Sequence, residues 1–178
     1  MRKINSILSI IMLVVFVMHM TASGLLMVHV IPYISVLMHT LSGTLILVVA
    51  VHTVIGIKLS VDTLSAMKKS DARYMNDNMI FWARRASGFA VLAFVIIHII
   101  IFMSEKGVPG TFTFFRLLCS ILLSLSVLIH VITNIRPLMI GLGRSGRGKG
   151  AATLILVSSL LLLASGAAFV VYYINMSL

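Results

Sequence analysis

The chain has 178 residues, of which 60% are hydrophobic and only 10% are charged, and its mean hydropathy is +1.15. A soluble domain of this length has too little interior to bury so much apolar surface. A membrane-spanning helix takes roughly 20 apolar residues, so the chain has room for about five such helices joined by short loops. The composition therefore predicts an all-α integral membrane helical bundle that forms a single domain over residues 1–178.

The formal net charge of +10 is also explained by a membrane location. Lys and Arg collect in the cytoplasmic loops of membrane proteins, so this charge indicates a topology and no nucleic-acid partner. The single cysteine, Cys119, excludes an internal disulfide, a CxxCH haem attachment and a cysteine-ligated iron–sulfur cluster. A cofactor held among the lipid-embedded helices would therefore need histidine or methionine ligands.

The apolar segments alternate with polar turns along the chain. In chain order, the expected spans are about Ile7–His29, Ile34–Leu59, Phe81–Phe102, Phe112–Ile135 and Ala151–Ile174. The first run is longer than the core of a signal peptide, so we expect a retained span. The connecting segments are expected to be an outer turn at Pro32, an inner loop over Lys58–Asn78, an outer turn over Ser104–Thr111 and a basic inner loop over 136–149.

The positive charges fix the expected orientation of these spans. Twelve of the 14 Lys and Arg residues fall on one side of the predicted membrane: Arg2, Lys3, Lys58, Lys68, Lys69, Arg73, Arg84, Arg85, Arg136, Arg144, Arg147 and Lys149. Only Lys106 and Arg116 fall on the other side. The positive-inside rule therefore predicts a multi-pass protein of the cell (inner) membrane with a cytoplasmic N-terminus.

Four histidines occupy matched depths in these spans. An ionisable side chain within a membrane span is costly, and by default it faces the bundle interior and a partner. With the predicted orientation, His52 and His130 fall in the inner half, and His19 and His98 fall in the outer half. A haem iron takes two axial imidazoles from facing helices, so the two pairs predict two haem irons in a bundle of four helices. Interior histidines bonded across helices are the alternative.

His39 competes with His19 for the outer pair. It precedes His52 by thirteen residues on the same expected helix, which turns through about 1300° and leaves the two faces ~140° apart. Both side chains are therefore not expected to face the same interior. We favour His19 and keep His39 as the reserve axial ligand or as a group near an outer quinone site.

Further polar side chains lie near the predicted inner ends of the spans. Arg84, Arg85 and Ser87 begin the third span, and Asn134 ends the fourth. Ser87 is eleven residues before His98, hence on nearly the same helix face but about 16 Å nearer the cytoplasm. All four are candidates for binding a quinone carbonyl or a haem propionate. Snorkelling of the arginines and helix packing of the serine are the alternatives.

The segment FWARRASGFAVLAFVIIH, from Phe81 to His98, resembles the cytochrome b subunits of the succinate dehydrogenase/fumarate reductase family. In that family an Arg-x-Ser-Gly-like start of a helix precedes a haem histidine, and here these residues are Arg85-Ala86-Ser87-Gly88 and His98. About five spans with one histidine on each of four resemble the di-haem members.

The resemblance implies a transmembrane cytochrome b domain with two haems b and no dicarboxylate chemistry of its own. It implies an electron-transport subunit that anchors a flavoprotein and an iron–sulfur protein on the cytoplasmic side. Membrane quinone or menaquinone would be its substrate, lipid would surround it, and complexes of this kind can form oligomers.

Two other functions stay open at this point. A haem b anchor of a formate dehydrogenase, hydrogenase or similar oxidoreductase would place its partner outside, away from the basic face. A small transporter or structural membrane protein would use the histidines for protonation or packing. A reduced-minus-oxidised spectrum separates this last class, because only a cytochrome shows a b-type band.

Overall fold

The computed structural model describes residues 1–32, 34–69, 79–103, 112–143 and 149–177, and its regular secondary structure there consists of α-helices. The helices are α1 (Arg2–Met27), α2 (Ser35–Lys69), α4 (Met79–Met103), α5 (Phe112–Gly141) and α6 (Lys149–Ser177). Four of them, α1, α2, α4 and α5, are long and apolar enough to cross a membrane, and the apolar run described in α6 is the shorter Ser159–Tyr172. The protein is an all-α multi-pass membrane bundle, as its composition predicts.

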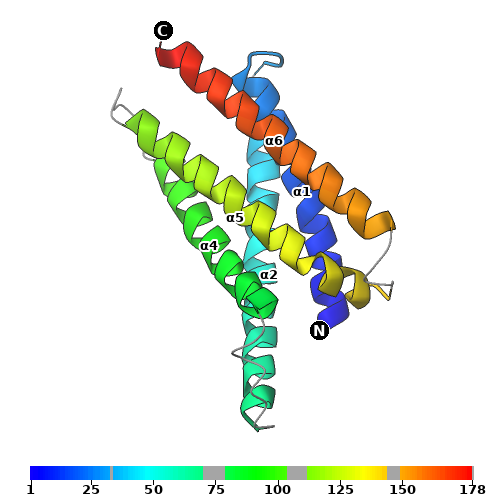
Figure 1. The fold of residues 1–178 in the computed structure, drawn as a ribbon. Helices are drawn as coiled ribbons and strands as arrows, with labels where there is room; N and C mark the ends of the chain where they lie inside the picture. The colour runs from blue at the N-terminus through cyan, green and yellow to red at the C-terminus, as the bar shows by residue number, and fades with distance from the viewer. Residues whose placement is uncertain (33, 70–78, 104–111, 144–148, 178) are drawn as a thin grey trace.

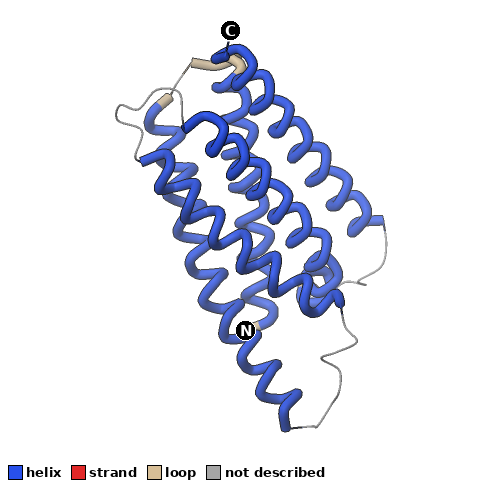
Figure 2. The backbone as a smooth tube through the Cα atoms, turned by 60° about the vertical axis from the view of Figure 1, so that its left-hand side comes forward, coloured by secondary structure: helices blue, strands red, loops and turns tan. Residues whose placement is uncertain are grey.

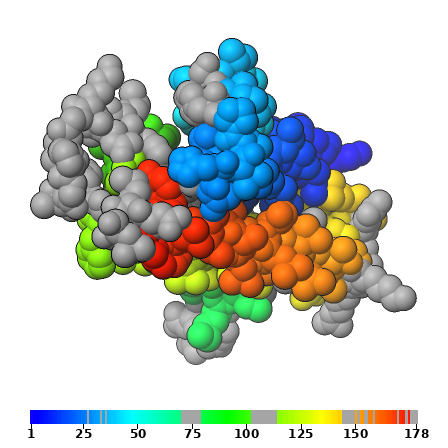
Figure 3. All heavy atoms as spheres, turned by 90° about the horizontal axis from the view of Figure 1, so that it is seen from above, coloured from blue at the N-terminus to red at the C-terminus, as the bar shows by residue number. Residues whose placement is uncertain are grey.

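The bundle is built from two helical hairpins and a fifth helix (Figure 1). Helix α1 packs along α2 to form the first hairpin, and α4 packs along α5 to form the second. Helix α6 packs against both α1 and α5, and Figure 3 shows it in orange and red beside the blue α1. Among the described residues α2 has at most marginal backbone contact with α4 or α5, so the two hairpins meet directly mainly through α1 and α5.

Two helices extend further than the sequence analysis predicted. Helix α2 continues to Lys69 through most of the expected inner loop, and Figure 2 shows this end projecting beyond the other helices. The reason is that residues 58–69 contain no Gly or Pro and end in Lys68 and Lys69, whose charges favour a helix C-terminus. The rest of that loop, the expected outer turn over 104–111 and residues 144–148 lie outside the described residues.

Helix α5 also continues past its predicted end at Ile135. It runs through Pro137 to Gly141, although a proline inside a helix removes one backbone hydrogen bond. The turns on both sides of Pro137 keep their helical form, so this proline lies within the helix where the sequence analysis placed a loop.

Small residues form the contacts between helices. The buried polar side chains among the described residues are all serines: Ser6, Ser87, Ser120, Ser126 and Ser165. A Cβ added to Gly141 of α5 would collide with the Oγ of Ser6 on α1 and lie 3.1 Å from its Cβ. Helices in lipid associate through such small residues, because lipid tails are as apolar as the helix surfaces.

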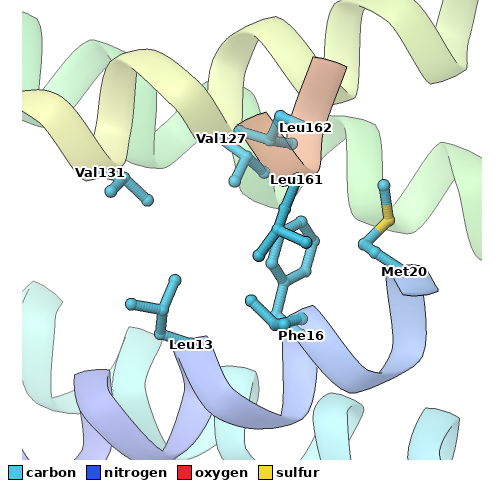
Figure 4. A pocket seen from close by; sticks show the side chains of 8 residues that line it. Leu13, Phe16, Met20, Val127, Val131, Leu161 and Leu162 are labelled. Carbon is cyan, nitrogen blue, oxygen red and sulfur yellow. The ribbon is translucent and has the colours of Figure 1, made fainter. Parts of the chain in front are cut away.

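The apolar cavity between α1, α5 and α6 is separate from the histidines (Figure 4). Its lining is hydrophobic throughout: Leu13, Phe16, Val17, Met20, Val127, Val131, Leu161 and Leu162. Because no polar group lines it to orient a ligand, the cavity does not mark the candidate site.

Candidate functional site: two histidine pairs between the hairpins

The first pair joins the two hairpins through α2 and α5. His52 and His130 are both half-buried, and they lie close enough for the charge of one imidazole to act on the other. One imidazole therefore comes from each hairpin, from helices that have at most marginal direct backbone contact.

The second pair joins the hairpins through α1 and α4. His19 and His98 are also half-buried and interact electrostatically, and the charge of Arg116 acts on His98 as well. On α4, His98 follows Ser87 by eleven residues, or about 16 Å of helix rise, and Ser87 touches His130. The two pairs therefore lie at two levels of the bundle, in the combination that their predicted depths indicate.

The ring of His130 packs against Ser87 and Gly88 of α4. The Oγ of Ser87 lies 3.2 Å from Nδ1 of His130, and the Nδ2 of Asn134 lies 3.4 Å from the same nitrogen. A Cβ added to Gly88 would be 3.2 Å from Cε1 of the ring. Glycine at this position therefore leaves the space that the imidazole occupies.

His52 has a similar neighbour that the sequence analysis missed. The Oγ of Ser9 on α1 lies 3.5 Å from Nδ1 of His52. The chain separation from Ser9 to His52 is 43 residues, and the separation from Ser87 to His130 is also 43. This equal spacing is the signal that could have identified Ser9 from the sequence.

Similar separations relate the other site residues of the two hairpins. Ser9 and Ser87 are 78 residues apart (87 − 9), His52 and His130 are 78 apart (130 − 52), and His19 and His98 are 79 apart (98 − 19). Each histidine pair thus takes one histidine from each hairpin at nearly the same separation along the chain.

At the second pair, one imidazole nitrogen has no hydrogen-bond partner. The Nδ1 of His19 is buried and is not hydrogen-bonded to any described residue. Leaving a buried polar atom unsatisfied is costly, so this nitrogen is a candidate for binding a further group.

The remaining predicted site residues lie around these pairs. His39 is exposed on α2 while His52 is half-buried, which agrees with the ~140° between their faces. The Arg85 guanidinium stacks on the Phe81 ring, 3.4 Å from Cζ to the ring centroid, and Nη1 donates to the Phe81 carbonyl. The carbonyl of Arg84 accepts a hydrogen bond from Ser87. A role of these residues toward quinone or a propionate stays a prediction.

Positive charge gathers at one end of the bundle. In the part of the chain that the structure describes, the Lys and Arg side chains at the N-terminal end of α1 and at the adjoining helix ends are Arg2, Lys3, Lys58, Lys68, Lys69, Arg84, Arg85 and Arg136. Among the described Lys and Arg side chains only Arg116, near the start of α5, belongs to the opposite end. The bundle is therefore strongly asymmetric in charge along its length.

Comparisons of the chain with family models, with curated proteins and with solved structures found no match. Within the described ranges no three or more His, Cys, Asp or Glu side chains come together as a metal site.

Proposed function

We propose that this protein is a di-haem cytochrome b membrane anchor of the succinate dehydrogenase/fumarate reductase type. It would pass electrons between membrane quinone and a flavoprotein/iron–sulfur partner on the cytoplasmic side. The observation that carries this proposal is the presence of two imidazole pairs at two levels, each pair taking one histidine from each hairpin. Packing alone does not require a polar pair between helices that barely touch.

The residues present fit a haem at each level. A haem iron takes its four equatorial nitrogens from the macrocycle and two axial ligands from the protein, and the ligands and their burial tune its potential. His52 and His130 would hold the inner iron, and His19 and His98 would hold the outer one. When bound, haem supplies reversible one-electron chemistry. The buried Nδ1 of His19, which has no hydrogen-bond partner among the described residues, is consistent with a further group at the outer level, and Gly88 leaves room for the His130 ring at the inner level.

The basic end of the bundle fits the proposed partner side. Positive and negative surfaces that meet across an interface steer association and fix its register, so an iron–sulfur subunit with an acidic docking surface suits this end. The inner pair is the nearer of the two to it, since Ser87 and His130 adjoin the start of α4 and the end of α5. Arg84 and Arg85 lie at the same end as candidates for a quinone carbonyl or a propionate. A partner at the opposite end, as in the formate dehydrogenase alternative, would meet little positive charge.

A reduced-minus-oxidised spectrum of membranes containing the full chain tests the proposal. We expect a b-type band that loses about half its amplitude in each of four variants, H19A, H52A, H98A and H130A. Double variants within one pair should lose no more than the single variants, whereas doubles across pairs should lose the whole band. Absence of a b-type band in the wild-type protein would favour the transporter or structural alternative.

A further inference from the structure

The serine beside each imidazole of the His52–His130 pair uses its only proton within its own helix. The hydroxyl of Ser87 donates to the carbonyl of Arg84 at 3.1 Å. The hydroxyl of Ser9 donates to the carbonyl of Asn5 at 2.8 Å. A hydroxyl has one donor proton and two acceptor lone pairs, so toward the imidazole each serine is left as an acceptor.

The accepting oxygen of Ser87 lies 3.2 Å from Nδ1 of His130. A neutral imidazole has one N–H and one bare nitrogen, and the hydrogen bond at one nitrogen decides which tautomer is present. An accepting Ser87 oxygen at Nδ1 calls for a proton on Nδ1, which leaves the lone pair on Nε2.

The side chain of Asn134 favours the other tautomer of His130. The Nδ2 of Asn134, a donor, lies 3.4 Å from Nδ1 of His130, and a donor there would favour the other tautomer. Of the two contacts of this NH2 group, the one to the His130 carbonyl, at 2.8 Å, is much shorter than the one to Nδ1. Ser87, at 3.2 Å, is also the nearer of the two groups to Nδ1.

We propose that Ser9 and Ser87 are positioning residues that hold His52 and His130 as the Nδ1–H tautomer, so that Nε2 presents its lone pair between the hairpins. This inference rests on the proposed function for the iron that Nε2 would bind, but the tautomer itself is a property of the chain alone. A serine Oγ lies near a histidine Nδ1 in both hairpins, with the same separation of 43 residues. This recurrence supports the positioning role independently. The contact is 3.2 Å for Ser87 and 3.5 Å for Ser9, so the effect of Ser87 is expected to be the larger.

The first test reads the tautomer without any metal. The full chain, labelled with ¹⁵N-histidine and placed in lipid nanodiscs before haem is added, gives separate imidazole nitrogen shifts for a protonated and a bare nitrogen. We expect Nδ1–H at His130 in the wild-type protein and a shift of the population toward Nε2–H in S87A. The control is S165A, which removes a buried serine hydroxyl from α6, a helix without histidine.

Two results of this measurement would overturn the inference. The first is Nε2–H at His130 in the wild-type protein. The second is a loss of Nδ1–H in a variant of Asn134 to Leu, since that would make the amide and not Ser87 the controlling group. We expect N134L to keep the Nδ1–H form, because it removes only the competing donor.

The second test uses the haem-loaded protein. Removing a hydrogen-bonded neighbour of a ligating histidine typically costs 10- to 100-fold in metal affinity, so S87A should lose about that factor for one haem only. A hydrogen bond from Nδ1–H to an acceptor makes imidazole a stronger donor, so the midpoint potential of the same haem should rise in S87A. S9T should retain the wild-type potential while S9A raises it.

The two tests separate this inference from the proposed function. Nδ1–H at His130 in a chain that binds no haem would uphold the positioning role and refute the cytochrome. Two bound haems whose affinity and potential are the same in S87A, S9A and S165A would uphold the cytochrome and refute the positioning role.

Discussion

Replacing Gly88 by alanine tests whether α4 shapes the space of a functional imidazole. The added Cβ would lie 3.2 Å from Cε1 and 3.5 Å from Nδ1 of His130, whereas carbon atoms in good contact are about 3.5–4.0 Å apart. The ring must therefore move by a few tenths of an ångström. Overpacking of this kind costs about 1–3 kcal/mol. Since a free ring can shift to relieve the contact and an iron-bound ring is held in place, the cost falls on the haem-bound state and corresponds to at most a roughly 5- to 140-fold loss of haem affinity at about 1.4 kcal/mol per tenfold.

The assay is a haem titration of the purified full chain, followed by Soret absorbance, with the His19–His98 site as the internal reference. The matched control is G43A on α2, where an added Cβ meets nothing within 4 Å. Both substitutions gain about 1 kcal/mol of helix propensity, so their difference isolates the contact with His130. Equal titration curves for G88A and G43A would refute the reasoning.

Three further predictions concern other parts of the bundle. H19A should lose one haem of two while H39A keeps both, because His39 is exposed; haem quantification of the two variants would reveal the reverse pattern if α2 carried two ligands. G141A should lower the free energy of unfolding in detergent by about 1–3 kcal/mol through its collision with Ser6, and the additional change S6A should restore most of it; additive losses would contradict the contact. A single cysteine at Lys68, in a chain with Cys119 replaced by serine, should react with an impermeant thiol reagent only from the cytoplasmic face; labelling from outside would invert the orientation.

The sequence predicts the spans well because lipid imposes a minimum apolar length on each of them. It does not predict where the helices end. Hydropathy indicates whether a residue lies in lipid or in water, but it does not indicate the backbone conformation. By hydropathy, the polar segment 58–69 and the turn after Pro137 are therefore predicted to be loops, although both are helical. Only the structure shows that α2 and α5 continue beyond the apolar segments.

The candidate site likewise has a part that the sequence predicts and a part that only the structure shows. The depth of a histidine along its helix follows from counting residues, and in the structure the charges of His52 and His130, and of His19 and His98, act on one another. The role of these four residues as axial ligands stays a prediction. Ser9 was not predicted as a site residue, because its role depends on a contact with a neighbouring helix. The depth and the face of a residue describe its position on one helix only. Comparing the hairpins with one another, and not each helix alone, supplies the missing information.

The most direct test of the central claim is a pyridine haemochrome assay on the purified full chain with protein quantified by amino-acid analysis. We expect two b-type haems per chain in the wild-type protein, one for each histidine pair, and one per chain in H130A and in H98A. A wild-type protein with one haem or none, prepared from cells with ample haem, would contradict the assignment of both pairs as axial ligands.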